Sequence, residues 1–388
     1  MPKTVVFFVH GIGQHATGWS RAPDGPVAAL EAALARYKDH GFPAGKKLAD
    51  YLDLVEIRYD DIFDQVLDTF QELGRSLPAN TGFSWLDAVR ELFASVDERK
   101  DLFLRYGGDV LLYCGFDLVA RAVRLRVNSV IATKIYRAYL AVAESPGEVP
   151  RLAVVAHSLG TTVAQDALFQ LAQAKWDDDV VAVADKRPDL AANPNLRPAE
   201  RTDYQAVVTG ARANPDRPVP VGLDALFLVS NTVPLLRQVS GEYPLLKTAS
   251  GGYDCAGVYN INHALDPVSR IGGGSANPTP RPDWTNITIR HVHNANIHGY
   301  AHYLSNPAVH GPLFWRLIDP DFGDSCFAEA QRLAQSAEWT GFGGEFAGLE
   351  AQARARIEDE LRGLVTGSAS VGALRSAIEA LRRRIEGG

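Results

Sequence analysis

One serine lies between a stretch that predicts a strand and a stretch that predicts a helix, where its hydroxyl could act as a nucleophile. An apolar run at 152–155 ends abruptly just before it, and a pattern with helical period follows at 161–175. The residues two before and two after it, Ala156 and Gly160, are small enough for a tight turn. The segment favours a nucleophile elbow, in which Ser158 is held in a strained conformation above a sheet. The plainer interpretation is a serine that caps the helix.

A serine hydroxyl needs a histidine to take its proton and a carboxylate to fix the tautomer of that histidine. The expected carboxylate is Asp266, because the alternating run 258–262 ends just before it. A carboxylate past the carboxyl end of a strand lies where ligands bind to a parallel sheet, and Pro267 stiffens the turn. Asp224 and Asp254 are weaker candidates, because they lie before or at the start of their strands.

Two histidines follow the last expected strand, and either could be the base. His298 comes first and precedes Gly299, which gives it room to turn toward the serine. His302 is the alternative, four residues later, where the sequence already predicts a helix. His291 and His293 share one strand face and could imitate a metal pair, but no third ligand is near them. We therefore expect the base to be His298 or His302, and we expect neither a metal nor a cofactor.

The developing oxyanion needs two backbone N–H donors. The residue after the nucleophile, Leu159, is expected to supply one. The second is expected from the loop after the first strand, from Ile12 or, as the next choice, from Gly11. Glycines in this loop allow the backbone to approach a substrate closely.

Strands and helices must alternate to position these groups. The predicted strands are 4–9, 52–59, 151–156, 224–230, 254–262 and 285–292; the predicted helices are 24–38 and 161–175, with a helical region at 62–143. This order predicts an α/β fold with a mostly parallel sheet covered on both faces. A polar loop is expected at 177–221, as a lid or binding loop. A helical tail at 325–388 suggests two amphipathic helices, broken near Gly367.

The helical region 62–143 is the expected insert of the fold. Its apolar residues, with Arg121, Arg124 and Arg126 behind them, favour packing in the core and a solvated basic face. A cap over the site or a transient contact with a membrane surface is the alternative.

Composition excludes some functions. The 388 residues carry a net charge of −7, which argues against a nucleic-acid partner. The three cysteines are far apart, which indicates a reducing compartment and no redox motif. We see neither a signal peptide nor an apolar run long enough to span a membrane, and therefore expect a cytoplasmic protein. The C-terminal helices could join copies in a homo-oligomer.

Three segments together resemble the α/β-hydrolase superfamily, in particular its lipase-like branch of phospholipases A1 with a DDHD domain and GPI-inositol-deacylase-like lipases. They are Val9-His10-Gly11-Ile12-Gly13-Gln14, Ala156-His157-Ser158-Leu159-Gly160 and 260–268. The resemblance implies a mostly parallel sheet of eight strands in a hydrolase domain over 1–320, with a helical extension over 321–388. It also implies hydrolysis of an acyl ester, of a small molecule or a lipid, through an acyl-enzyme. A peptidase or thioesterase with the same triad, or a binding or scaffold protein on this fold, is the alternative.

Overall fold

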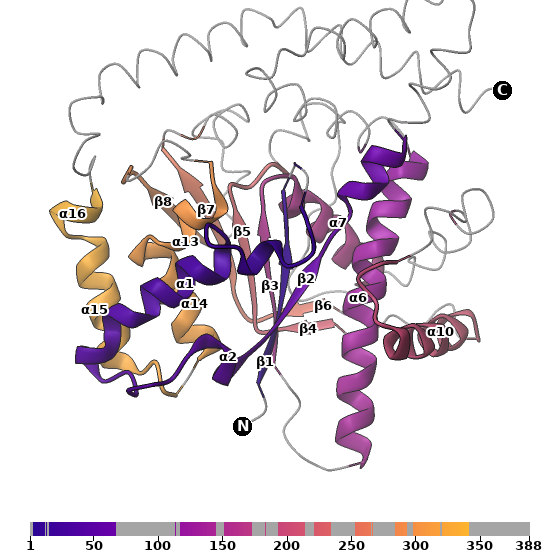
Figure 1. The fold of residues 1–388 in the computed structure, drawn as a ribbon, viewed down its shortest axis with the longest axis horizontal. Helices are drawn as coiled ribbons and strands as arrows, with labels where there is room; N and C mark the ends of the chain where they lie inside the picture. Colours follow the sequence, from indigo (N-terminus) through magenta and orange to yellow (C-terminus); the bar gives the residue numbers. More distant parts are fainter. Residues whose placement is uncertain are drawn as a thin grey trace, which may run out of the picture.

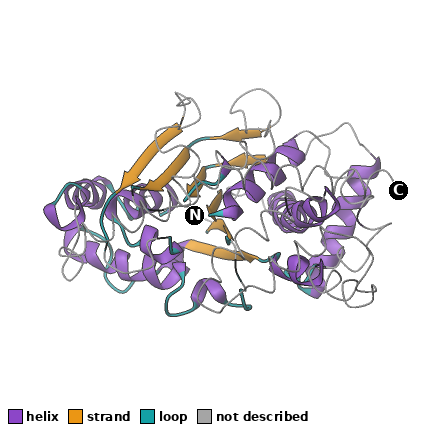
Figure 2. Cartoon of the chain, turned by 90° about the horizontal axis from the view of Figure 1, so that it is seen from above, coloured by secondary structure: helices purple, strands orange, loops and turns teal. Residues whose placement is uncertain are grey.

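The computed structural model describes residues 3–11, 13, 15–66, 113, 117–144, 151–172, 183, 193–213, 221–233, 253–264, 266, 284–292, 298–318 and 320–340. The chain alternates between strands and helices as the sequence predicts, and the helices lie on both sides of a central sheet (Figures 1 and 2). The protein is therefore an α/β protein.

The central sheet has six strands among the described residues, in the order β2-β1-β3-β5-β7-β8, and each strand runs parallel to its neighbours. Five of the predicted strands and the second part of the sixth, 254–262, form it: β1 Thr4–Val9, β2 Leu52–Ile57, β3 Leu152–His157, β5 Ala225–Val229, β7 Val258–His263 and β8 Trp284–Ile289. The resemblance implies one sheet of eight strands, whereas the described residues place six strands in this sheet and two in a separate one.

One expected strand, 254–262, is divided in two. Its first part, β6 (Tyr253–Cys255), pairs with β4 (Val221–Leu223) in a separate two-stranded sheet. At Gly257 the chain passes to the central sheet, where the Gly257 carbonyl accepts a hydrogen bond from the Leu226 N–H (2.9 Å) and β7 begins. A continuous apolar pattern cannot reveal such a change of sheet, because both parts are strands.

Successive side chains of each strand point to opposite faces, and each face has its own core. In β1, Val6 and Phe8 belong to one cluster and Phe7 and Val9 to the other. The first cluster packs under α1 (Pro26–Leu34), the 3₁₀ helix η2 (Ala35–His40), α13 (Tyr300–Leu304) and α14 (Pro307–Leu317). The second packs under α6 (Asp117–Glu144) and α7 (Leu159–Ala172). Burial on both faces explains why the central strands β1, β3 and β5 are almost entirely apolar.

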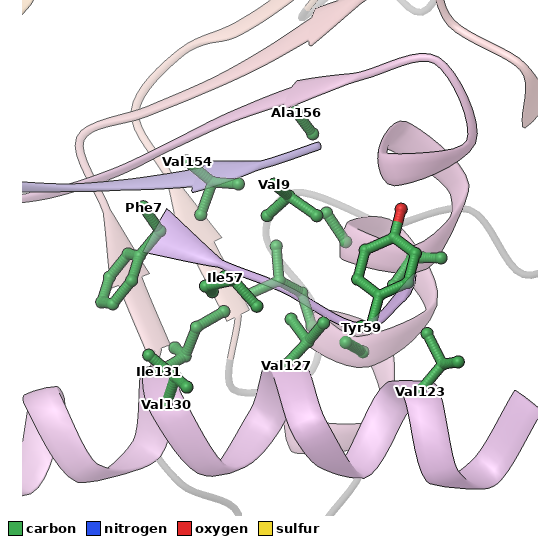
Figure 3. Packing of buried hydrophobic residues seen from close by; sticks show 14 of the residues in the cluster. Phe7, Val9, Ile57, Tyr59, Val123, Val127, Val130, Ile131, Val154 and Ala156 are labelled. Carbon is green, nitrogen blue, oxygen red and sulfur yellow. The ribbon is translucent and has the colours of Figure 1, made fainter. Parts of the chain in front are cut away.

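Helix α6 is the part of the expected insert that the structure describes best, and it belongs to the core. Val123, Val127, Val130 and Ile131 face the ends of β1 and β2 (Figure 3). The basic face expected to be solvated is partly buried: Arg124 pairs with Asp166 and Arg126 with Asp61, and the two arginines are 9 % and 2 % exposed. That expectation was wrong for these two arginines, because carboxylates on other segments neutralise them. Residues 67–112 lie outside the described residues.

The expected polar loop 177–221 contains a helix, α10 (Pro198–Ala213). Its narrow apolar face, with Tyr204 and Val207, packs on the core cluster beneath α6. Its acidic residues meet the basic residues of α6, since Arg137 pairs with both Asp203 and Glu200. The loop prediction was wrong over this stretch because the apolar face of the helix is narrow, so that its composition is as polar as that of a loop.

The predicted C-terminal extension begins with α15 (Asp324–Ala334) and α16 (Ala337–Thr340). Cys326 and Ala330 of α15 belong to the same core cluster as α1 and α14. This first helix of the extension therefore shares the core of the preceding domain. The two amphipathic helices expected around Gly367 lie outside the described residues. Among the described helices, none combines the length and apolar character needed to cross a bilayer.

Candidate active site

Ser158 lies at the turn between β3 and α7, and its backbone is strained. Its φ angle is 55°, in the left-handed region that residues with a side chain rarely adopt. The turn is fixed on both sides, because the Ser158 N–H donates to the Val229 carbonyl (2.9 Å) and the Ser158 carbonyl accepts from the Thr161 N–H (2.9 Å). The expected helix 161–175 begins earlier, at Leu159, so the serine directly precedes a helix N-terminus. Such strain persists only where surrounding contacts impose it, and it is typical of functional sites.

Two glycines let the end of β1 lie against this turn. A Cβ on Gly160 would be 2.2 Å from the His10 carbonyl oxygen and 2.8 Å from that of Val9. A Cβ on Gly11 would be 2.7 Å from the Cβ of Ser158. No larger residue fits at either position without a backbone shift, so the loop after β1 and the serine turn are in direct contact.

Asp266 and His298 form a hydrogen-bonded pair. The His298 Nδ1–H donates to Asp266 Oδ2 over 2.8 Å, which leaves the His298 Nε2 lone pair to accept a proton. The hydroxyls of Ser230 and Tyr303 donate to the same oxygen, each over 2.6 Å. Burial alone would raise the pKa of Asp266, but His298 and these hydrogen bonds hold the pKa well below its usual value. The carboxylate is therefore ionised and can fix the tautomer of His298.

His157, the residue before the serine, holds the His298 loop against the turn. Its Nε2–H donates to the His298 carbonyl over 2.7 Å, and its ring stacks on Tyr300 with centroids 4.8 Å apart. Burial, aided by the nearby His298, lowers the pKa of His157 well below its usual value, so the ring is neutral. The nucleophile turn and the base loop are thus joined by a hydrogen bond across 141 residues of sequence.

The other acid and base candidates lie elsewhere. His302 is buried on α13, with its ring centroid 5.3 Å from that of His263. Asp224 accepts the Leu152 N–H (3.0 Å), which is a structural role between β3 and β5. Asp254 lies within β6, outside the central sheet. His291 is placed near Trp339, and His293 lies outside the described residues.

The two expected oxyanion donors are only partly described. Leu159 is the first residue of α7, so its N–H is one of the donors that a helix leaves without an acceptor in its first turn. Gly11 touches the serine turn, as described above, whereas Ile12 lies outside the described residues. The positive end of the α7 dipole adds to the affinity of this position for a negative oxygen.

Three residues of the site were not predicted from the sequence: His157, Ser230 and Tyr303. Ser230 had a usable signal in the sequence, because it directly follows the apolar run 225–229 as Ser158 follows strand 152–157. In the structure its φ angle is also positive, at 51°. Tyr303 and His157 had none, since their partners come from distant segments.

No protein-family model matches this chain, and no curated protein matches it either. The interpretation of the site therefore rests on its residues, their geometry and their chemistry.

Proposed function

We propose that the protein is a serine hydrolase of the α/β-hydrolase fold that cleaves an acyl ester through an acyl-enzyme. Ser158 is the nucleophile, His298 the general base and Asp266 the carboxylate that orients the base. Leu159 and the loop at Gly11 and Ile12 supply the oxyanion donors. The choice of an ester rests on the resemblance to lipase-like hydrolases.

The observation that carries the proposal is a strained serine beside a His–Asp pair. Each of the three groups follows a strand of one parallel sheet: Ser158 follows β3, Asp266 follows β7 and His298 follows β8. These carboxyl ends meet at one edge of the sheet, where such folds bind ligands. The chain order Ser, Asp, His is the order of α/β-hydrolases. The strand order also supports this fold, because the nucleophile strand lies beside the strand that leads to the oxyanion loop.

The steps follow from the protonation states. The His298 Nε2 accepts the proton of the Ser158 hydroxyl while its oxygen attacks the ester carbonyl, and the oxyanion meets the N–H donors. The imidazolium, stabilised by Asp266, then gives its proton to the departing alcohol. Water then enters and attacks the acyl carbonyl while His298 takes its proton. The bond between the acyl carbon and the Ser158 oxygen breaks, the imidazolium returns the proton to Ser158, and the acyl group leaves as an acid.

Labelling with a small fluorophosphonate tests this assignment without the natural substrate. A small probe is needed because Ser158 is fully buried in the structure. We expect the wild type to react at Ser158 and Ser158→Ala to remain unlabelled while keeping its fold by circular dichroism. Mass spectrometry of the labelled peptide separates Ser158 from Ser230, which also has a positive φ angle. A label on Ser230, or equal labelling of Ser158→Ala, would contradict the proposal.

A series of p-nitrophenyl esters with acyl chains of increasing length tests which chain length the protein prefers. If an apolar pocket receives the acyl chain, kcat/KM should rise with each added methylene. Each methylene would contribute up to about 1–3 kcal/mol to binding of the transition state. A steep preference for acetyl over octanoyl esters would indicate a small-ester hydrolase instead of a lipase.

A further inference from the structure

A second group of polar side chains lies behind the loop after β1, apart from the triad. His10 directly follows β1, His15 lies in the same loop, and Asp60 follows β2 at the start of the helical turn 60–66. One nitrogen or oxygen atom from each residue lies within 4.8 Å of the others. His10 Nε2 is 3.6 Å from Asp60 Oδ1, and His15 Nδ1 is 3.8 Å from Asp60 Oδ2.

Backbone carbonyls orient both imidazoles. The Nδ1–H of His10 donates to the Gly11 carbonyl over 2.6 Å, so its lone pair is on Nε2. This lone pair accepts the Tyr59 backbone N–H over a long 3.3 Å, a hydrogen bond that a metal would replace. The Nδ1–H of His15 donates to the Gly13 carbonyl over 2.9 Å, which leaves the lone pair of His15 on Nε2. A histidine that binds a metal commonly has its other ring nitrogen fixed in this way.

Asp60 has one oxygen whose hydrogen-bonding capacity is unused. Its Oδ2 accepts the backbone N–H of His15. Its Oδ1 is buried and accepts no hydrogen bond from the part of the protein that the structure describes, and the residue is only 8 % exposed. Arg58 Nε is 3.8 Å from this oxygen, too far for a hydrogen bond, and Arg58 Nη1 donates to Thr17 (2.7 Å). Burying an unsatisfied carboxylate oxygen is costly, so a group that coordinates it would be favoured.

We propose that His10, His15 and Asp60 form a zinc site, with water as the fourth ligand. Two imidazole nitrogens and one carboxylate oxygen are a usual set for Zn²⁺, whereas Mg²⁺ and Ca²⁺ prefer oxygen ligands alone. In the structure His15 stacks on His10, with ring centroids 4.0 Å apart at 21°. Binding requires His15 to tilt from this stack until the ligand atoms converge. His15 can do so, because its side chain is 23 % exposed and lies between Gly13, at φ 121°, and Gly18.

The ion would join the carboxyl ends of β1 and β2 immediately behind Gly11, the residue that touches Ser158. The site is independent of the proposed hydrolase function, since none of its ligands belongs to the triad. Arg58 forms an ion pair with Asp60, and it would compete with the metal for the carboxylate.

Zinc titration of the metal-stripped full chain tests the site, with Co²⁺ absorption as a second measurement. We expect one Zn²⁺ per chain and a Co²⁺ spectrum with the intense visible bands of a four-coordinate site. His15→Ala and Asp60→Asn should weaken binding more than about 100-fold, because loss of a ligand exceeds the loss of a group that only orients one. His40→Ala, at an exposed histidine beside Glu329, is the matched control and should bind as the wild type does.

Arg58→Gln sharpens the test, because removal of the competing cation should tighten zinc binding. Equal affinity of the wild type and His15→Ala, or no binding by the wild type at micromolar zinc, would overturn the proposal. So would binding that survives in His15→Ala and is lost in His298→Ala, because the ion would then lie at the candidate triad.

Discussion

Close main-chain packing positions Ser158, whereas side-chain hydrogen bonds position Asp266 and His298. Around the serine, the Val229 carbonyl and two threonine hydroxyls bind its backbone, and at two glycine positions any Cβ would collide. Around the acid and base, the contacts are hydroxyls of Ser230 and Tyr303 and the imidazole of His157. The first arrangement is sensitive to added atoms, and the second to lost hydrogen bonds. Substitutions should therefore damage the two halves in different ways.

The largest effect is expected at the base. His298→Ala should lower turnover by about 10⁶-fold, as much as Ser158→Ala, and the double variant should be no worse, because residues that act as one unit are not additive. His302→Ala should lose only about tenfold, equivalent to about 1.4 kcal/mol, through looser packing. Turnover of a p-nitrophenyl ester measures both. Inactive His302→Ala with active His298→Ala would reverse the roles of the two histidines.

The next largest effect is expected at the acid. Asp266→Asn should keep the fold and lower turnover by about 10⁴-fold, since an amide cannot fix the reactive tautomer of His298. Asp224→Asn is the control, because Asp224 binds a backbone N–H and is remote from the base. The control should lose some stability and keep its turnover. Normal turnover by Asp266→Asn would remove this residue from the triad.

A smaller effect, on the free energy of unfolding, is expected at the turn that holds Ser158. Gly160→Ala should lower the free energy of unfolding by about 3 kcal/mol, because its Cβ meets backbone atoms that cannot move independently. Gly222→Ala, in β4, has nothing within 4 Å of its new Cβ and should be almost neutral. Urea denaturation compares the two variants. Equal stability would mean that the end of β1 is not held closely against the turn.

The smallest effect is expected on stability, from loss of the Tyr303 hydroxyl that binds Asp266. Tyr303→Phe should cost about 1.5 kcal/mol of stability at neutral pH, because it removes a hydrogen bond to a buried charge. The pKa of Asp266 is lowered in the folded state, so its contribution is complete above the unfolded value of about 3.9 and is lost as the pH falls toward the folded value. The gap between variant and wild type should therefore narrow in acid. A gap that is constant with pH would mean that Tyr303 acts only by packing.

The same comparison explains what the sequence could predict. The turn at Ser158 was predictable because its strand, its small residues and its helix are consecutive. Asp266 was predictable because a strand and a proline flank it. His298 could not be separated from His302 by sequence, since the choice depends on which imidazole meets a carboxylate that follows another strand. Tyr303 and His157 depend on packing between distant segments. Helix α10 was missed because Arg137 and Lys134, on another helix, supply the charges that hold Glu200.

The central position of β1 has a consequence for synthesis of the protein. β1 is made before the other described strands, yet it pairs with β3, and its first residue, Thr4, donates to the carbonyl of Leu317 across 313 positions. Parallel pairing of this kind is slow and non-local. A nascent chain that has just completed the Ser158 turn still lacks β7, β8, Asp266 and His298. Under the proposed function, the ribosome would have to make the segments with Asp266 and His298 before the chain could attack an ester. Until β2 and β3 are made, the unpaired apolar β1 would need protection from aggregation.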